Sequence, residues 1–277
     1  VIGMFSRPEA RRAEAAATYG FPTTDKLERL IADPRVDIVL VLTPPAAHLE
    51  TVRLAAAAGK HILLEKPVDT TTDRAREIVA LAHQAGVRLG IVLQHRTRPG
   101  ARHLRQLIDS GALGQLATAS ASIRWWRAQS YYDEPGRGTK ARDGGGVLLT
   151  QAIHALDLFL SLTGPAAAVS AMAATSRLHQ MECEDVVAGA VRFASGAIGA
   201  IDATTASYPG FPERLEFVFD RATAVLSGEA LTLYRHDGSS ETLFGTGDGH
   251  GGGADPMGYS HVQHRAIIAD FLDALDQ

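Results

Sequence analysis

Short apolar runs alternate with amphipathic segments over residues 1–95. The run VDIVLVLT at 36–43 is continuous, rich in β-branched residues and ended by two prolines, which is typical of a strand buried on both faces of a parallel sheet. The runs HILLEKP at 61–67 and VRLGIVLQH at 87–95 follow, and the helical patterns at 46–60 and 70–86 separate them. This alternation predicts βαβ units and a doubly wound α/β domain.

The pattern changes after a predicted helix at 99–110. Seven strand-like runs joined by short turns follow, and the only clear helix among them is LTQAIHALDLFLSL at 149–162. Successive hairpins predict a large open antiparallel sheet and hence an α+β second domain. A last amphipathic helix is expected at 260–275. The predicted domains are residues 1–117, which bind a dinucleotide, and residues 118–277, which bind substrate and mediate oligomerisation.

The beginning of the chain lacks one element of a dinucleotide fold. A strand at Val1–Phe5 leads directly into a helix, whereas the first strand and its glycine-rich turn are expected about 20 residues before the residue that reads the ribose. Gly251–Gly253 cannot replace that turn, because they neither follow a strand nor open a helix, and a loop is expected there. We therefore expect the first strand and its glycine turn to be missing.

Composition narrows the class of protein. A net charge of −4 gives no general attraction to nucleic acid or to an anionic membrane. The single cysteine, Cys183, excludes an intramolecular disulfide and a cysteine-cluster metal site. No apolar stretch approaches the roughly 20 residues of a membrane helix, and the beginning does not resemble a signal peptide. A cytoplasmic protein with neither nucleic acid nor membrane as partner is expected.

Ligands of doubly wound sheets bind at the carboxyl ends of the strands. Residues 43–45, 65–67 and 94–96 are therefore expected to converge on one crevice. Lys66 follows a buried strand, and partial desolvation lowers the pKa of such a lysine, which lets it exchange a proton with a substrate hydroxyl. The alternative for the EKP tripeptide is a surface turn in which Lys66 points outward.

The segment GGGVLLTQAIHALD at 144–157 is the second candidate site. On a continuous helix, Thr150, Gln151, His154 and Asp157 are three or four residues apart and share one side. Thr and Gln are poor metal ligands, so no metal site is expected. A structural histidine in the core remains the alternative to a catalytic one.

The ordered combination TPPAAH (43–48), EKP (65–67), LQHRTRP (93–99) and GGGVLLTQAIHALDL (144–158) resembles the Gfo/Idh/MocA family of nicotinamide-dependent oxidoreductases. The resemblance covers essentially the whole chain. It implies a Rossmann domain followed by an open antiparallel sheet that carries substrate and forms a dimer or tetramer interface. It also implies that a short C-terminal tail is missing in addition to the first strand.

The resemblance implies roles for individual residues. Lys66 matches the proton-transferring lysine of the family, Pro67 is expected to follow a cis peptide bond, and His154 matches the histidine that binds the reacting hydroxyl or relays its proton. Thr150 stands where many relatives have aspartate, so Thr150 and Gln151 are left to hydrogen-bond the substrate.

The cofactor is expected at the ends of the parallel strands. Gln94 replaces the usual asparagine, and the expected contacts are Ser6, Arg7, Arg11, Thr43, Pro44, His48, Glu65, Lys66, Pro67 and Gln94. Ser6 and Arg7 replace the acidic residue that reads the ribose 2′-hydroxyl of NAD, and a hydroxyl with a guanidinium suits a 2′-phosphate. NADP is therefore favoured over NAD, with a solvated helix face as the alternative for Arg11 or Arg12.

The loop at 124–143 is rich in aromatic and basic residues. Trp126 and Arg142 are its candidate substrate contacts, through ring stacking and through a carboxylate; an oligomer interface or a packed loop is the alternative. The loop most resembles the branch with phthalate cis-dihydrodiol dehydrogenases. The predicted activity is hydride transfer between a secondary alcohol of a ring diol and NAD(P), on CH-OH or CH-CH groups. A sugar or cyclitol dehydrogenase or reductase, and a non-catalytic dinucleotide-binding sensor, remain alternatives.

Overall fold

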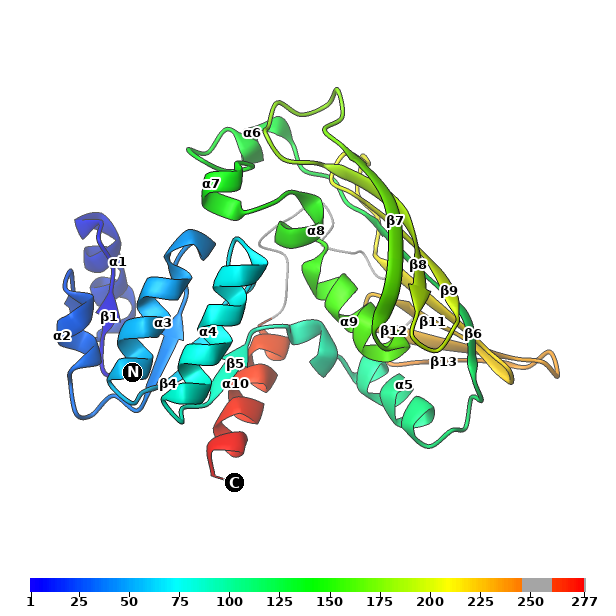
Figure 1. Ribbon diagram of the computed structural model, residues 1–277, viewed down its shortest axis with the longest axis horizontal. Coiled ribbons are helices and arrows are strands. Elements are labelled where there is room, and N and C mark those ends of the chain that lie inside the picture. Colours follow the sequence, from blue (N-terminus) through cyan, green and yellow to red (C-terminus); the bar gives the residue numbers. More distant parts are fainter. Residues whose placement is uncertain (246–260, 277) are drawn as a thin grey trace. The chain divides into compact units, whose positions relative to one another are not determined.

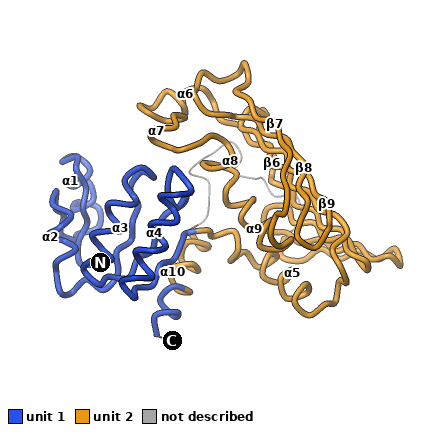
Figure 2. Tube along the Cα trace, in the orientation of Figure 1, with its two compact units in different colours: residues 1–92, 271–277 blue, residues 93–270 orange. Residues whose placement is uncertain are grey.

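The structure, a computed structural model, describes residues 1–245 and 261–276. The chain divides into two compact units, one formed by Val1–Val92 with Phe271–Gln277 and the other by Leu93–Asp270 (Figure 2). The boundary therefore falls after Val92 and not after residue 117, and the end of the chain returns to the first unit. The glycines at 251–253, predicted to form a loop, lie outside the described residues.

Packing explains both differences from the predicted domains. In the second unit, Ala101 and Leu104 of α5 (Pro99–Asp109) belong to the same buried cluster as the large sheet. In the first unit, the ring of Phe271 lies so close to Gly90 that a Cβ there would be 2.6 Å from it. Residues 93–117 therefore lead into the second core, and the last residues complete the first one.

The first unit has the α/β alternation that the pattern predicts (Figure 1). Its strands form two separate parallel sheets, β1-β2 and β3-β4-β5, and not one continuous sheet. Its elements before Val92 are β1 (Met4–Phe5), α1 (Glu9–Tyr19), β2 (Thr23–Thr24), α2 (Leu27–Ile31), β3 (Ile38–Val41), η1 (Pro45–Ala47), α3 (His48–Ala57), β4 (His61–Leu64), α4 (Thr72–Gln84) and β5 (Leu89–Ile91).

A small core positions the ends of β3 and β4. Val41, Ile62 and Leu64 of these strands are buried together with Val52 of α3 and Ile78 of α4. Burying each of these side chains contributes about 1.5–3 kcal/mol. Because the core holds the strands in register, the residues that follow them are held at one edge of the sheet.

The second unit combines helices with a large sheet. Its elements are η2 (Gln94–Thr97), α5, β6 (Leu116–Arg124), α6 (Gln129–Tyr132), α7 (Lys140–Asp143), α8 (Val147–Thr150), α9 (Ile153–Thr163), β7 (Ala166–Ala174), β8 (Val186–Phe193), β9 (Ile198–Thr204), β10 (Arg214–Phe219), β11 (Ala222–Ser227), β12 (Ala230–Arg235), β13 (Ser240–Leu243) and α10 (Val262–Leu275), of which α10 continues into the first unit.

The large sheet is mixed rather than purely antiparallel. Its eight strands are ordered β13-β12-β11-β10-β6-β9-β8-β7, and β6 pairs in parallel with β9. The other pairs in this sheet are antiparallel, as the hairpin pattern predicts. The parallel pair arises because β6, the first strand of this sheet in chain order, inserts between β9 and β10, which come from later hairpins.

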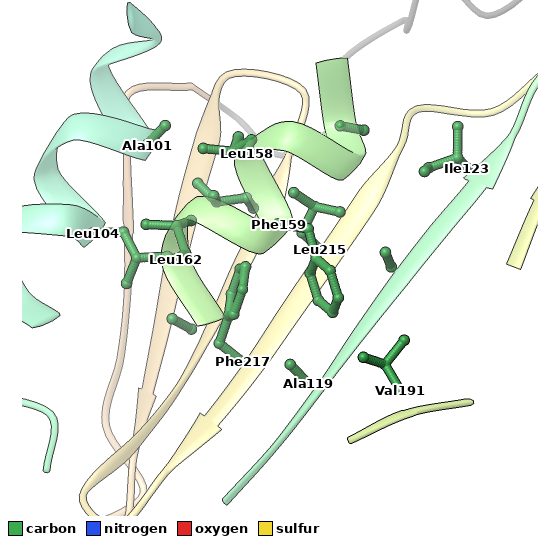
Figure 3. Close-up of a cluster of buried hydrophobic side chains, with 14 of the residues drawn as sticks. Ala101, Leu104, Ala119, Ile123, Leu158, Phe159, Leu162, Val191, Leu215 and Phe217 are labelled. Atoms are coloured by element: carbon green, nitrogen blue, oxygen red, sulfur yellow. The ribbon is translucent and has the colours of Figure 1, made fainter. Parts of the chain in front are cut away.

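Helix α9 packs on one face of this sheet. Leu158, Phe159 and Leu162 belong to the buried cluster that also contains the sheet residues Leu215 and Phe217 (Figure 3). The Phe159 and Phe217 ring centroids are 5.7 Å apart. The core therefore fixes the rotation of α9 about its axis, which decides where its polar residues lie.

No single helix of the described residues is long and apolar enough to cross a membrane. The bent pair Lys140–Thr150 and Ile153–Thr163 meets the length and composition requirements together. Most of the apolar side chains of α9 are buried against the sheet, which accounts for that composition.

Candidate functional site

The first group of candidate residues lies at the carboxyl edge of β3 and β4. Val41 pairs with Leu64 in the parallel register, so Thr43 and Lys66 each follow their strand by two residues. Lys66 is half-buried, and its backbone N–H donates to the Glu65 carboxylate at 2.7 Å. The Lys66–Pro67 peptide bond is cis, which confirms that expectation. The role of Lys66 in proton transfer stays a prediction.

His48 connects the two loops at this edge. It is fully buried, with Nε2 2.8 Å from the Thr43 carbonyl oxygen and Nδ1 3.1 Å from that of Val68. Its ring therefore holds the TPPAAH segment against the residues that follow Pro67. A direct contact between His48 and the cofactor stays a prediction.

Asp69 fastens the same loop to the beginnings of α3 and α4. Its carboxylate accepts hydrogen bonds from the Arg74 side chain at 2.6 Å and from the backbone N–H groups of Leu49 and Thr70. Burial raises the pKa of Asp69, but the hydrogen bonds from Arg74 and Thr70 outweigh burial and lower it. Asp69 is therefore an ionised anchor close to Lys66 in the sequence.

One buried polar atom of the first unit indicates where a dinucleotide could bind. The Thr43 side-chain oxygen is buried and has no hydrogen-bond partner among the described residues. An unpaired buried hydroxyl at the carboxyl end of a parallel strand is a natural contact for a bound ligand. Thr43 and the neighbouring backbone therefore fit a cofactor edge, while the roles of Pro44, Glu65 and Pro67 in binding stay predictions.

The residues after β1 form a second, basic group in the first unit. Arg12 donates to the carbonyl oxygens of Ser6 and Arg7 at 2.8 and 2.6 Å, so it holds the backbone of this turn. Arg7 and Arg11 are exposed, and Ser6 is half-buried. The arrangement leaves Ser6 and Arg7 accessible on a braced turn, which fits the predicted phosphate contact.

The second unit corrects the expected helix at 149–162. Helix α8 ends at Thr150 and α9 begins at Ile153, and the segment Lys140–Thr150 is bent by 52° relative to Ile153–Thr163. The prediction that Thr150, Gln151 and His154 share one side of a continuous helix is therefore wrong. The backbone N–H of Ala152 bonds to the Val147 carbonyl at 2.8 Å, a wide turn that interrupts the regular pattern.

Thr150 and Gln151 take part in contacts within the second unit. The Thr150 hydroxyl lies 2.7 Å from the Gly146 carbonyl oxygen and also contacts the Gln151 side-chain oxygen. The Gln151 amide nitrogen in turn donates to the Tyr131 hydroxyl at 3.4 Å. The break in the helix therefore aims these side chains toward the loop before α7, and their substrate contacts stay predictions.

His154 lies on α9 in a polar niche of the core. It is 9% exposed, and its ring centroid is 5.1 Å from that of His95. Arg98 lies within 2.7 Å of His95 Nε2 and pairs with Glu213 at 2.5 Å. Gln94, from the same short η2 segment, has a buried side-chain oxygen without a partner among the described residues. Gln94 therefore fits a ligand contact on the second unit.

The glycines before α8 serve the protein backbone. A Cβ on Gly146 would be 1.8 Å from the Glu184 carbonyl oxygen, to which the Val147 N–H bonds. The Glu184 carboxylate also accepts from the Gly146 N–H at 3.0 Å. An internal carboxylate thus occupies the start of α8, and close approach to the protein itself explains Gly146.

The basic residues of the 124–143 loop are largely paired within the protein. Arg137 and Arg142 both lie within 4.0 Å of the Glu134 carboxylate, and Arg142 also donates to the Pro135 carbonyl. Arg127 is buried, with its guanidinium 5.7 Å from the Trp125 ring centroid. The sequence predicts that Arg142 contacts a substrate carboxylate. The Glu134 carboxylate would compete with the substrate for that contact.

Aromatic rings make up the rest of this loop. Trp126 is half-buried and meets Tyr208 edge-on, with ring centroids 5.6 Å apart. Tyr132 bonds to Thr205 at 2.7 Å, and burial raises its pKa to about 12, so it stays protonated at neutral pH. Trp126 remains a predicted substrate contact, and Tyr132 is a structural residue.

Tyr131, His95, Arg98 and Glu213 were not singled out from the sequence as site residues. Tyr131 was recognised only as part of an aromatic loop, and Glu213 is far from the segment in sequence. The spacing of HRTR at 95–98 offered a weak signal, because His95 and Arg98 are three residues apart. Within the described residues, no group of three or more His, Cys, Asp or Glu side chains could hold a metal ion.

Two family models match this chain. Residues 1–93 match the oxidoreductase family model with an NAD-binding Rossmann fold, and residues 101–225 match the GFO/IDH/MocA C-terminal domain. The chain belongs to the Gfo/Idh/MocA oxidoreductase family, and the predicted fold class and family are confirmed.

Individual relatives give the range of the family. The chain is 34% identical over 222 residues to 1,5-anhydro-D-fructose reductase of Ensifer adhaerens, covering 75% of this chain and 63% of that protein. It is 29% identical over 210 residues to trans-1,2-dihydrobenzene-1,2-diol dehydrogenase of Mus musculus, covering 75% and 61%. The chain thus spans less than two thirds of the length of either curated relative.

A solved structure supports the same comparison. The WlbA dehydrogenase from Bordetella pertussis, in complex with NADH and UDP-GlcNAcA, matches with a TM-score of 0.78 and 29% identity. The match covers 82% of this chain and 68% of that chain. Relatives therefore include named dehydrogenases and reductases of sugars and diols.

Proposed function

We propose that this protein transfers a hydride between NADP(H) and a secondary alcohol carbon of a neutral, ring-shaped polyol or diol. The observation that carries the choice of a neutral substrate is the pairing of Arg137 with Glu134 and of Arg142 with Glu134 and Asp143. A dicarboxylate such as the phthalate dihydrodiol needs cations that are not already neutralised, because burying an unpaired carboxylate is costly. The likeness to an anhydrosugar reductase supports the same class.

The chemistry assigned to this chain is proton transfer and binding. Oxidation of the alcohol removes a hydride from the carbinol carbon and a proton from its hydroxyl, and reduction reverses both. Bound NADP⁺ would supply the hydride acceptor. Lys66 and His154 hold and move the hydroxyl proton, since Thr150, in the position of a carboxylate, cannot act as a base at neutral pH.

Orientation of the substrate falls to the polar and aromatic groups of the second unit. Thr150 and Gln151 hydrogen-bond the ring hydroxyls, and Trp126 covers a ring face. The Gln151 amide contacts Thr150 through its oxygen and Tyr131 through its nitrogen, and these contacts orient the amide that would bind the substrate. No metal is required for these steps.

NADP is proposed ahead of NAD on the basis of the turn after β1. Ser6 and Arg7 would hold the 2′-phosphate, while Thr43 and Gln94 would contact the rest of the cofactor. The main argument is the absence of an acidic residue at Ser6–Arg7, since a carboxylate there would repel a phosphate. NADH in the WlbA complex supports nicotinamide binding in the family without distinguishing the two cofactors.

We also infer a dimer or tetramer built on the open face of the large sheet. That face carries Met172, which is 84% exposed, and Ile198, which is 61% exposed, together with small residues such as Ala188, Ala190 and Ala200. An exposed apolar sheet face is a typical interaction surface. Analytical ultracentrifugation of the full-length protein and of Met172→Glu tests this assignment.

The cytoplasmic location expected from the sequence stays a prediction.

The deciding experiment is a substrate screen with the full-length protein that follows nicotinamide absorbance. The panel contains 1,5-anhydro-D-fructose, levoglucosan, D-xylose, trans-1,2-dihydrobenzene-1,2-diol and the phthalate cis-dihydrodiol, each with NADP(H) and NAD(H). Turnover of neutral members and none of the phthalate compound is expected. Preferred turnover of the phthalate dihydrodiol would refute the neutral-substrate proposal.

A further inference from the structure

A chain of buried polar contacts runs from His154 into the core of the second unit. The His154 ring lies against the His95 ring, with centroids 5.1 Å apart and planes inclined by 36°. His95 Nε2 is 2.7 Å from Arg98 Nη2, and Arg98 Nη1 is 2.5 Å from the Glu213 carboxylate. His95 is 3% and Glu213 5% exposed. This chain, His154–His95–Arg98–Glu213, lies entirely within one compact unit.

The donor chemistry of arginine decides the protonation of His95. A guanidinium has five N–H donors and no acceptor, so Arg98 can only donate to the nitrogen that it approaches. His95 Nε2 must therefore carry a lone pair. His95 is consequently neutral, with its proton on Nδ1, because an imidazolium would have an N–H pointing at the Arg98 N–H.

Glu213 explains why Arg98 can stay charged in this place. Its side chain is 7% exposed and that of Arg98 is 11% exposed, so a cation without its partner would be buried and uncompensated. Arg98 also donates to the Gly228 carbonyl at 3.1 Å. The other charged groups on η2 and α9, Arg96 and Asp157, pair with each other. The charges on both sides of His95 are thus balanced.

We propose that His95 is a positioning residue for His154, held as the neutral Nδ1–H tautomer by the Arg98–Glu213 pair. This inference rests on the proposed role of His154 in proton transfer. The His95 ring restricts the orientation of the His154 imidazole. It also presents a neutral π-system to His154 at the moment when His154 gains a proton, where a second cation would oppose that step.

The first test reads the state of His95 without any turnover. Side-chain ¹⁵N NMR of the full-length protein is expected to show His95 as the Nδ1–H tautomer. The Nε2 atom of His95 should remain unprotonated when the pH falls to about 5.5, which is one unit below the usual pKa of a histidine side chain. An Nε2–H tautomer, or conversion to imidazolium around pH 6.5, would overturn the proposal.

The second test separates positioning from folding. With the best substrate found by the screen, His95→Ala is expected to lower kcat at least tenfold, while KM for the substrate stays within about threefold of the wild-type value. His103→Ala is the matched control, since it removes a histidine ring from α5 that contacts Phe244. It should leave kcat unchanged. A His95→Ala enzyme with the wild-type kcat would contradict the inference.

The third test uses Glu213→Gln, which keeps an acceptor for Arg98 and removes the charge. The uncompensated Arg98 cation should disfavour protonation of His154 and move the acid limb of the kcat/KM profile for alcohol oxidation to lower pH by about half a unit. A merely structural role would leave that limb in place.

Absence of turnover by the wild-type protein would refute the proposed function. Wild-type turnover together with variants whose kcat and pH profile are unchanged would refute this inference alone.

Discussion

Asp157 of α9 and Arg96 of η2 form an ion pair with two hydrogen bonds, each 2.6 Å long. The side chain of Asp157 is 14% and that of Arg96 52% exposed, and the hydrogen bond with Asp157 raises the pKa of Arg96. This geometry fastens the first turn and a half of α9 to the segment that carries His95. Asp157 is therefore a support of the helix that carries His154.

The Asp157 assignment predicts a contrast between two neighbouring positions on α9. Asp157→Asn should lower the free energy of unfolding by about 1 kcal/mol, because Arg96 is half exposed and solvent replaces much of the pair. It should leave kcat within tenfold of the wild type. His154→Asn should instead reduce kcat by about 10² or more. Denaturant unfolding and steady-state kinetics measure both, and equal losses of kcat would show that Asp157 reacts.

Removal of the Lys66 amine separates an enzyme from a dinucleotide sensor. Lys66→Ala should lower kcat by about 10²–10⁴, the usual contribution of a positioned general acid or base. NADPH binding, followed by fluorescence, should change only a few fold. The exposed Lys26→Ala on the same unit is the control for loss of a positive charge. Unchanged kcat in Lys66→Ala would exclude the assigned role.

The turn after β1 predicts the cofactor preference. Arg7→Ala should weaken NADPH binding about 10- to 100-fold, since a charge-assisted hydrogen bond contributes roughly 1.5–3 kcal/mol. NADH binding should be unaffected. Arg29→Ala, which removes an exposed cation from α2, is the matched control. Tighter binding of NADH than of NADPH by the wild-type protein, measured by titration, would refute the argument from Ser6 and Arg7.

Gly146 and Gly145 make a matched pair for the beginning of α8. Gly146→Ala brings a Cβ to 1.8 Å from the Glu184 carbonyl oxygen, so the backbone must move, and the thermal midpoint of the second unit should fall by several degrees. At Gly145 the nearest atom is the Leu149 Cβ at 3.3 Å, and Ala should be tolerated. Equal melting temperatures for the two variants would contradict the close approach of these backbones.

The Asp69–Arg74 pair predicts a pH-dependent contribution to stability. Asp69 is buried and its pKa is lowered in the folded state, so the stabilisation is present above the unfolded-state pKa of about 3.9 and is lost as the pH falls below it. Arg74→Met should cost about 1–2 kcal/mol at pH 7, because solvent reaches Arg74 and Asp69 keeps its backbone hydrogen bonds, and the difference from wild type should shrink between about pH 5 and pH 3. Arg76→Met, at an exposed pair on the same helix, is the control in urea unfolding.

The local patterns predicted most of the helices and strands, but not β2, β13 or the short helices α2, α6 and α7. Continuous apolar runs predicted β3, β4 and β5. The expected burial of the 36–43 run on both faces is wrong, because Leu40 is 46% and Leu42 66% exposed. Hairpin runs predicted most of the second sheet. The break between Thr150 and Ile153 could not be read from spacing, since LTQAIHALDL has good helical periodicity on both sides of it. The turn depends on Gly146 packing against Glu184, a residue distant in sequence.

The sequence by itself determined the family, the α/β and α+β character of the two parts, and the candidacy of Lys66 and His154, because these depend on local residue types and their order. Only the tertiary structure decided the domain boundary after Val92, the parallel pairing of β6 with β9, the internal pairing of the loop arginines and the polar chain behind His154. Each of these features depends on residues that are far apart in the chain and meet only when the core is packed. The interactions that stabilise them therefore cannot be recognised from a short stretch of sequence.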